Sequence, residues 1–446
     1  PVHAEVAVSR VEVDGKRVVV LGLGRSGRAA ARLAARLGAR VVGVDQSSAV
    51  APIEGVELRV GGPAPEVVRG ADLLIVSPGV PPPDPTYEAA REAGTPIVGE
   101  LGFARALLPT LPCVGITGTN GKSTVTTFVG DLLRCSGFTP FVGGNLGEPL
   151  SSAVGGAADV LVVEVSSYQL ERPGGFRPNV GVILNLTPDH LGRHGTMAGY
   201  AGAKARLFES MRPDDLAILP LNVPLLADAC GGHAARRACI GAHPGLVRTG
   251  MRVTAKLDAG ATAAFDLSEF AVPGVHNLDN AAVALFLAWC IGASPGALQL
   301  AIPRLAGLPH RLEVVRDEGV RWIDDSKATN VEATLAAVGG LDRQAVVLLG
   351  GQAKGPGFAA LAAALAKHRA VLTFGASGPA ISEELARAGV SAPHHSSLDA
   401  AVRAARGLAQ PGDAILLSPG CASFDAFSDF TERGRFFRAL AHEEAP

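Results

Sequence analysis

The chain has 446 residues, of which 48% are hydrophobic and 18% charged, so it is long enough for roughly two to four domains with large apolar cores. The formal net charge is −2, and lysine and arginine form no basic block, which argues against nucleic acid or a membrane surface as a partner. The longest apolar run, residues 281–293, is shorter than the roughly 20 residues that span a bilayer. Six cysteines are scattered without a C-x-x-C pair, and no signal-peptide core lies near the start, so we expect a cytoplasmic protein without membrane insertion.

Residues 16–46 are the first regular segment, predicted to form a strand, a glycine loop, a helix and a second strand. Gly22, Gly24 and Gly27 make the spacing G-x-G-x-x-G, and Asp45 ends the second strand. In dinucleotide-binding loops with this spacing, backbone amides contact a diphosphate and the acid contacts a ribose. Alone, the pattern predicts an NAD-dependent dehydrogenase, although any nucleotide diphosphate can use the same amides.

Two strand-and-turn segments follow, at residues 71–82 and 95–104, and indicate an alternating α/β domain. Ser77 ends the first of these strands. Open α/β sheets bind ligands at the carboxyl ends of their strands, so Ser77 is a candidate binding residue. Ordinary turn chemistry is the alternative.

The sequence GITGTNGKST, residues 115–124, carries the strongest functional signal in the chain. It follows an apolar strand and opens an apolar-periodic helix, which is the arrangement of a phosphate-binding loop. Lys122 can contact the β- and γ-phosphates of a nucleotide, and Ser123 can hold Mg²⁺. The strict pattern would need glycine at Ile116, so this is a variant loop. A plain glycine turn would not account for a lysine followed by two hydroxyl residues, and we predict a nucleoside triphosphate site.

Polar residues also end the next strands. Asn145 lies in the glycine loop of FVGGNLG, and Glu164 and Ser166 end the apolar strand of ADVLVVEVSS. A carboxylate at the end of an apolar strand is costly unless it is paired or binds a metal, which makes Glu164 a candidate Mg²⁺ ligand. A surface acid at a strand end is the alternative.

His190 follows a further strand, and Lys204 lies among small residues in the predicted helix of YAGAKARLFE. His190 alone indicates a structural or acid–base histidine, because imidazole is an unusual ligand for Mg²⁺. Lys204 alone is consistent with a surface lysine whose ammonium group reaches solvent.

A long apolar helix, predicted over residues 273–292, has Asn277 in its first turn, where the side chain can cap the helix or contact a base or ribose. Strands and helices then alternate to the end of the chain, which predicts a doubly wound sheet. Its polar loops all follow strands and should lie on one edge of the sheet. The candidate residues in and around these loops are Asp324, Asp325, Ser326, Lys327, Thr329, Asn330, Lys354, Ser418, Ser423 and Phe430. His310 and Arg311 precede them, in a linker that enters the first strand of this part of the chain.

These motifs, in this order, resemble the Mur ligase family, the ATP-dependent enzymes that add amino acids to the peptidoglycan precursor. The resemblance covers essentially the whole chain, and it is strongest to the members that add D-glutamate to UDP-N-acetylmuramoyl-L-alanine. The D-N-P-R turn of the diaminopimelate- or lysine-adding members is absent from the sequence. The motifs are TGTNGKST, GGNLG, EVSSYQLE, LTPDH, YAGAKARLFE, PGVHNLDNA, GLPHR, DDSKATN, LGGQAKG and SPGCASFDAFSDFTERGRFF.

The resemblance implies a three-domain α/β protein. Residues 1–106 would form a Rossmann-like domain that binds the UDP-linked precursor through its glycine loop, in place of NAD. Residues 107–309 would form a phosphate-loop domain with a mostly parallel sheet that binds ATP. Residues 310–446 would form a Rossmann-like, doubly wound domain that binds the incoming amino acid. The implied cofactors are ATP and two Mg²⁺, and the implied substrates are UDP-N-acetylmuramoyl-L-alanine and D-glutamate, joined through an acyl phosphate. We expect a monomer whose third domain closes on its ligands.

The resemblance also assigns roles to individual residues. ATP would be bound by Gly118, Thr119, Asn120, Gly121, Lys122, Ser123, Thr124, Asn277, Arg311 and Asp325. The UDP-linked substrate would be bound by Gly24, Arg25, Ser26, Asp45, Gln46, Ser77, Asn145, Ser166 and His190. D-Glutamate would be bound by Thr329, Lys354, Ser423 and Phe430. One Mg²⁺ would be held by Ser123 and Glu164, and the second by His190 and a carbamylated Lys204. The catalytic residues would be Lys122, Glu164, His190, Lys204 and Lys327. One departure is Gly192, where the family often has an aspartate.

Three other functions fit the sequence less well. A folylpolyglutamate synthase also joins glutamate to a carboxylate, but it would lack the first domain with its GLGRSG loop. An NAD-dependent oxidoreductase would leave the phosphate loop and the third domain without a role. A non-catalytic nucleotide-binding switch would not need the lysines and hydroxyl groups that gather in the third domain.

Overall fold

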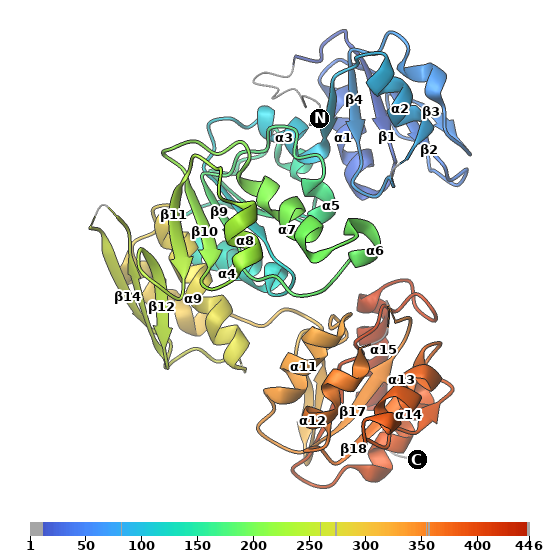
Figure 1. Ribbon diagram of the computed structural model, residues 1–446, viewed down its shortest axis with the longest axis vertical. Coiled ribbons are helices and arrows are strands. Elements are labelled where there is room, and N and C mark those ends of the chain that lie inside the picture. The colour runs from blue at the N-terminus through green and yellow to red at the C-terminus, as the bar shows by residue number, and fades with distance from the viewer. Residues whose placement is uncertain are drawn as a thin grey trace. The chain divides into compact units, whose positions relative to one another are not determined.

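The computed structural model describes residues 12–443 apart from 82, 259, 273, 354 and 356. Its strands form three sheets that follow one another along the chain, coloured blue, cyan to yellow-green, and orange to red in Figure 1. By their internal contacts the residues divide into two compact units. The first runs to residue 270 and includes 280–305, and the second comprises 271–279 and the chain from 306 onward. The expected α/β fold with three sheets is confirmed, whereas the domain borders at 106/107 and 309/310 stay a prediction.

The first sheet is wholly parallel, with the strand order β3-β2-β1-β4-β5. Its order reverses between β1 and β4, and such a switch point opens a crevice at the carboxyl ends of the strands. The strands are β1 (Arg17–Leu21), β2 (Arg40–Asp45), β3 (Val56–Val60), β4 (Leu73–Val76) and β5 (Ile97–Gly99). The helices are α1 (Arg25–Arg36), α2 (Pro85–Glu92) and α3 (Glu100–Ala106), with a 3₁₀ turn η1 (Pro65–Val68).

The second sheet has the order β14-β13-β12-β11-β10-β9-β6-β8-β7. It is parallel from β7 to β12 and ends in the antiparallel strands β13 and β14, so the prediction of a mostly parallel sheet is confirmed. The strands are β6 (Cys113–Thr117), β7 (Pro140–Gly144), β8 (Val160–Glu164), β9 (Val180–Ile183), β10 (Leu216–Pro220), β11 (Arg236–Ile240), β12 (Gly245–Thr249), β13 (Arg252–Lys256) and β14 (Thr262–Asp266).

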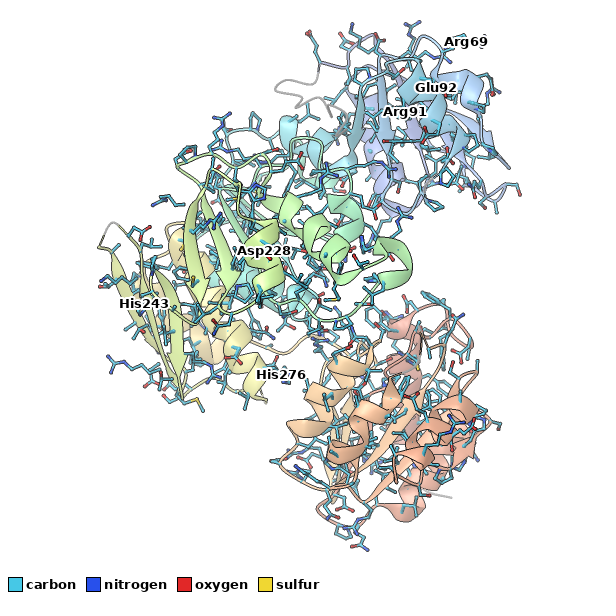
Figure 2. The ribbon with its side chains drawn as sticks, viewed as in Figure 1. Arg69, Arg91, Glu92, Asp228, His243 and His276 are labelled. Carbon is cyan, nitrogen blue, oxygen red and sulfur yellow. The ribbon has the colours of Figure 1, made fainter. Side chains whose placement is uncertain are left out.

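The helices of this part of the chain include the long apolar helix predicted from the sequence, which is α9. The α-helices are α4 (Lys122–Cys135), α5 (Ser167–Leu170), α6 (Leu191–His194), α7 (Met197–Ala205), α8 (Pro224–Ala229), α9 (Val275–Cys290) and α10 (Pro295–Ala301). The 3₁₀ turns are η2 (Leu150–Ala153), η3 (Arg206–Phe208) and η4 (Ile302–Arg304). Figure 2 labels His276, which lies at the beginning of α9 beside Asn277.

The third sheet has the order β15-β16-β20-β17-β18-β19 and is parallel except for β15 at one edge. The strands are β15 (Glu313–Glu318), β16 (Val320–Asp324), β17 (Ala345–Gly350), β18 (Ala370–Phe374), β19 (His394–His395) and β20 (Ala414–Leu417). The helices are α11 (Val331–Gly339), α12 (Ala362–Leu365), α13 (Gly378–Arg387), α14 (Leu398–Leu408) and α15 (Phe430–His442), with a 3₁₀ turn η5 (Phe358–Leu361).

Successive residues of β17 point to opposite faces of this sheet. Val347 and Leu349 belong to the apolar cluster that includes residues of α13, while Val346 and Leu348 belong to the cluster that includes residues of α14 and α15. Both faces are therefore covered, which confirms the doubly wound arrangement. Within the described residues, none of the helices has the length and apolar character that crossing a membrane requires.

Candidate active site

The phosphate loop connects β6 to α4 in the conformation that its glycines permit. Gly118 has φ +153° and Gly121 φ +83°, and Gly121 precedes the first helical residue without a side-chain cap. A Cβ atom at Gly121 would lie 2.6 Å from Oδ1 of Asn280, so a larger residue would not fit there. The first turn of α4 thus leaves its backbone N–H groups available for an anion such as a phosphate.

Asn185, just beyond β9, holds this loop in place. Its Oδ1 accepts hydrogen bonds from the backbone amides of Thr119 at 3.1 Å and Asn120 at 2.9 Å, and its Nδ2 donates to the carbonyl of Asn120 at 3.0 Å. Thr119 adds a hydrogen bond from its Oγ1 to the carbonyl of Thr187 at 3.1 Å. Asn185 was not among the predicted site residues. It could have been included, because it follows an apolar strand, as the other candidate residues do.

Two lysine side chains converge on one carbonyl of the loop. Nζ of Lys122 donates to the carbonyls of Gly118 at 2.9 Å and Thr119 at 2.8 Å, and Nζ of Lys204 donates to the same Gly118 carbonyl at 2.8 Å. Lys204 is only 1% exposed, and its Nζ lies 4.3 Å from the centroid of the Tyr200 ring. The interpretation of Lys204 as a surface lysine is therefore wrong.

The surroundings of Lys204 favour its neutral amine. Burial is the largest cause, the positive charge of Lys122 is the second, and together they place the pKa of Lys204 well below its usual value, while Asp189 opposes the shift. A neutral amine is a nucleophile and can add carbon dioxide to form a carbamate, whereas an ammonium ion cannot. The geometry is consistent with the carbamylation that the sequence resemblance implies for Lys204.

Glu164 ends β8 as a buried carboxylate, 2% exposed, so the alternative of a surface acid is wrong. Its Oε1 accepts a hydrogen bond from Nδ2 of Asn145 at 2.7 Å. Its Oε2 is also buried and has no hydrogen-bond partner among the described residues. An oxygen of this kind fits a hard cation such as Mg²⁺, and Ser123, half-buried in the first turn of α4, offers a hydroxyl oxygen for the same ion.

His190 stands at the start of α6 with a left-handed backbone, φ +54°. Its Nδ1 lies 3.0 Å from the hydroxyl of Tyr168, and its Nε2 lies 3.5 Å from Oδ2 of Asp189. About a third of the side chain is exposed. Gly192 follows on α6, and a Cβ atom there would meet nothing within 4 Å, so the fold has room for the aspartate that this chain lacks.

An open pocket lies at the carboxyl ends of β1, β2 and β4. It is lined by four of the residues predicted to bind the UDP-linked substrate, namely Gly24, Asp45, Gln46 and Ser77. Asp45 accepts hydrogen bonds from the amide of Leu23 in the glycine loop and from the amide of Ser47. The loop is tightly packed, since a Cβ atom at Gly27 would lie 1.8 Å from the carbonyl oxygen of Gly22.

The remaining residues predicted to bind this substrate lie on adjoining elements of the first unit. Nη2 of Arg25 donates to the carbonyl of Asn145 at 3.0 Å, and Ser26 is in the first turn of α1. Ser166 caps α5, because its Oγ accepts from the amide of Gln169 at 3.3 Å while the Gln169 side chain accepts from the amide of Ser166. Ser166 therefore has a helix-capping role that the prediction did not include.

In the second unit, Asp325 is 3% exposed at the end of β16. Its Oδ2 accepts from the hydroxyl of Ser418 at 2.8 Å, and its Oδ1 accepts from the amide of Leu312 at 3.3 Å. Burial raises the pKa of Asp325 to about 7, and the charge of Arg311 partly opposes the shift. Arg311 also helps to lower the pKa of His276, second to burial, which places it near the buried Asn277.

The loops at the carboxyl edge of the third sheet are joined to one another. The hydroxyl of Ser326 donates to the carbonyl of Phe430 at 2.8 Å, and Nζ of Lys327 lies 5.4 Å from the centroid of the Phe430 ring. Ser423 is buried, and Thr329 is half-buried at the end of the same polar loop as Lys327. The predicted D-glutamate ligand Lys354 lies outside the described residues.

Replacing Asp325 by asparagine is expected to make unfolding of the full chain less sensitive to pH. Because its pKa is raised to about 7 in the folded protein, Asp325 there keeps a proton that the unfolded chain loses near its ordinary pKa of 3.8. The contribution of Asp325 to stability therefore falls as pH rises from about 3.8 to about 7, by at most about 1.4 kcal/mol per pH unit. Urea unfolding between about pH 5 and pH 8, followed through Trp322 in a Trp289→Phe background, should show a larger loss for the parent protein than for Asp325→Asn. An equal loss in both would contradict this assignment.

Comparison with known proteins places the chain in a family. The Mur ligase MurD-like N-terminal domain matches residues 16–99, the Mur ligase middle domain matches 116–288, and the Mur ligase glutamate ligase domain matches 310–421. The UDP-N-acetylmuramoylalanine–D-glutamate ligase of Anaeromyxobacter dehalogenans is 42% identical over 461 residues, covering 97% of this chain and 99% of that protein. The enzyme of the same name from Pelotomaculum thermopropionicum is 39% identical over 442 residues, covering 95% of this chain and 97% of that protein.

A solved structure of MurF from Acinetobacter baumannii aligns with a TM-score of 0.61 at 17% sequence identity, covering 98% of this chain and 92% of that chain. At this identity the likeness shows a shared fold. The matched domains and the near-complete coverage of the relatives carry the stronger conclusion. The chain belongs to the Mur ligase family.

Proposed function

We propose that the chain is an ATP-dependent ligase that joins D-glutamate to UDP-N-acetylmuramoyl-L-alanine in the cytoplasm, as a step of peptidoglycan precursor synthesis. The substrates follow from the name of the relatives, which align over almost their full length. The observation that carries the chemistry is the buried Lys204, with its lowered pKa, which shares the Gly118 carbonyl with Lys122. Glu164, with its unpartnered buried oxygen, lies on β8, the strand next to the one that leads into the phosphate loop. We expect a monomer, with neither nucleic acid nor a membrane as partner.

ATP is proposed to bind at the phosphate loop, residues 118–124, where the first turn of α4 offers backbone N–H groups to its phosphates. Lys122 provides a compact positive charge that stabilises the negative charge of the γ-phosphate during its transfer. The nucleoside is proposed to be bound by Asn277, Arg311 and Asp325 of the second unit. The charge of Arg311 acts on Asp325 and on His276, which is next to Asn277 in the sequence. The carboxyl group of Asp325, with its pKa of about 7, can accept or donate a hydrogen bond to a ribose hydroxyl.

Two Mg²⁺ are proposed, one held by Ser123 and Glu164 and the other by His190 and carbamylated Lys204. When bound, the ions neutralise charge on the phosphates and orient the substrate carboxylate. Carbamylation replaces an amine that would repel a cation by an anionic oxygen that attracts one. The protein contributes the buried setting in which these charges act strongly, because Glu164 and Lys204 are both almost wholly excluded from water.

The UDP group of the precursor is proposed to bind in the pocket of Gly24, Asp45, Gln46 and Ser77, with Arg25, Ser26, Asn145 and Ser166 beside it. A carboxylate oxygen of the precursor forms a bond to the γ-phosphorus of ATP while the bond to the ADP oxygen breaks. The amine of D-glutamate then attacks the acyl phosphate, phosphate leaves with its bonding electrons, and the amine loses a proton. Thr329, Lys354, Ser423 and Phe430 are proposed to position D-glutamate, with Lys327 on the departing phosphate.

Purified protein with ATP and Mg²⁺ should release phosphate only when UDP-N-acetylmuramoyl-L-alanine and D-glutamate are both present, with one ADP formed per amide. L-Glutamate in place of D-glutamate is the matched control and should give a far lower rate. Phosphate release without either substrate would favour a nucleotide-binding switch. Amide formation without loss of the terminal phosphate of ATP would overturn the proposed reaction.

A further inference from the structure

Arg433, on α15, is the largest side chain that the second unit buries completely, at 0% exposed. Its four hydrogen bonds go to oxygen atoms that carry no formal charge. Nε donates to Oγ of Ser326 at 2.9 Å, Nη2 donates to the carbonyls of Ser326 at 2.7 Å and Cys421 at 3.1 Å, and Nη1 donates to the carbonyl of Ala422 at 3.3 Å. Burial lowers the pKa of Arg433 to about 10, which still leaves the guanidinium protonated at neutral pH. The nearby carboxyl groups of Asp425, Asp324 and Asp325 favour the charged form, but burial outweighs them. The buried guanidinium is therefore still costly for the fold, and its position calls for an explanation beyond packing.

The four acceptors lie in two loops at the carboxyl edge of the third sheet. Ser326 follows β16 and stands directly before Lys327, while Cys421 and Ala422 follow β20 and stand directly before Ser423. The loop after β17 joins them, because Gln352 and Ala422 exchange two backbone hydrogen bonds of 2.9 Å. One guanidinium thus ties together the loops that carry the proposed contacts to the amino acid and to the departing phosphate.

The backbone around the guanidinium is packed too closely for other side chains. Gly351, with φ +122°, approaches so near that a Cβ atom there would lie 2.4 Å from the carbonyl oxygen of Ala422 and 3.0 Å from Nη1 of Arg433. A lysine at position 433 has a single nitrogen and cannot reproduce the planar fork that reaches both loops at once. Arginine is therefore the side chain whose donor geometry matches this set of carbonyls.

We propose that Arg433 is a positioning residue for the amino-acid site, which fixes the loops after β16, β17 and β20 in register and so sets the affinity for the incoming amino acid without touching it. The proposal rests on the proposed function, because D-glutamate is taken as that amino acid. Ser326 extends the arrangement, since its hydroxyl accepts from Arg433 and donates to the carbonyl of Phe430. Two of the proposed substrate contacts, Lys327 and Ser423, each directly follow a residue that accepts a hydrogen bond from Arg433.

Arg433→Lys should raise the KM for D-glutamate by about tenfold or more, because small displacements of binding groups are costly, while the KM values for ATP and the UDP-linked precursor change by less than about twofold. Arg435→Lys is the matched control on the same helix. Arg435 is exposed, and its replacement should leave all three KM values unchanged. A folded Arg433→Lys protein with an unchanged KM for D-glutamate, or with all three constants raised together, would overturn the proposal.

Two further measurements keep the test decisive. If Arg433→Lys is too unstable to assay, Ser326→Ala removes one hydrogen bond to Arg433 and one to Phe430, and it should raise the same KM selectively. Hydrogen exchange needs no substrate: in Arg433→Lys, amides in 324–329 and 421–424 should exchange faster than in the wild type, while those of β15 should not. If these loops exchange faster in Arg433→Lys but the wild type does not turn over D-glutamate, the positioning role of Arg433 is supported and the proposed function is rejected. Unchanged exchange in these loops would reject the positioning role.

Discussion

Lys204→Ala is expected to lower the rate of D-glutamate-dependent phosphate release by about 10²- to 10³-fold or more. The wild-type amine is 1% exposed and hydrogen-bonded at 2.8 Å to the Gly118 carbonyl, in the same loop that is proposed to hold ATP. Burial and the charge of Lys122 lower the pKa of Lys204, which favours the neutral amine that reaction with carbon dioxide requires. The alanine variant can form no carbamate and so cannot supply an anionic oxygen to the cation site.

A short-chain carboxylic acid such as acetate or propionate should restore part of the activity of Lys204→Ala, because its carboxylate can occupy the space of the carbamate. The control is Lys256→Ala on the exposed face of β13, which should keep full activity with or without added acid. The ¹³C NMR spectrum of wild-type protein in ¹³C-bicarbonate should contain a carbamate signal that Lys204→Ala lacks. Full activity of Lys204→Ala without added acid would contradict the carbamate role.

Several features of the site could be predicted because parallel strands end on the same edge of a sheet. Asp45 and Ser77 are far apart in the sequence, yet both follow buried strands, and the structure places them around one pocket. The phosphate loop was predictable for a similar reason, since its glycine positions require backbone conformations that other residues seldom adopt. In both places the local pattern of the sequence determines which groups face the ligand.

The burial of a charged side chain could not be predicted from the local sequence. Lys204 lies among alanines and glycines, a setting that suits an exposed helix as well as a buried one, and its depressed pKa depends on the Gly118 loop 86 residues away. Arg433 lies in the segment FTERGRFF, where it resembles a surface arginine, and its acceptors come from two distant loops. In both cases the environment is made by segments that meet only in the folded chain.

Glu164→Gln is expected to reduce the same phosphate release by about 10²- to 10³-fold at low Mg²⁺, with partial recovery as the Mg²⁺ concentration rises. The substitution changes the charge with little change of shape. The glutamine Oε1 can still accept the hydrogen bond that Nδ2 of Asn145 makes at 2.7 Å, so the support from β7 is retained. The unpartnered Oε2, however, is replaced by an amide nitrogen that cannot ligate a cation.

Direct binding of Mn²⁺, followed by its electron paramagnetic resonance signal, separates a loss of the ion from a loss of the fold. Glu164→Gln should bind Mn²⁺ at least about tenfold more weakly in the presence of a non-hydrolysable ATP analogue, because one of two protein ligands has lost its charge. Glu209→Gln, which removes the charge of an exposed side chain paired with Arg206, is the control and should bind the ion as the wild type does. Unchanged Mn²⁺ affinity in Glu164→Gln would show that this carboxylate is not a ligand of the cation. Its buried oxygen would then have a structural role, in the packing of β8 against the loop that carries Asn145.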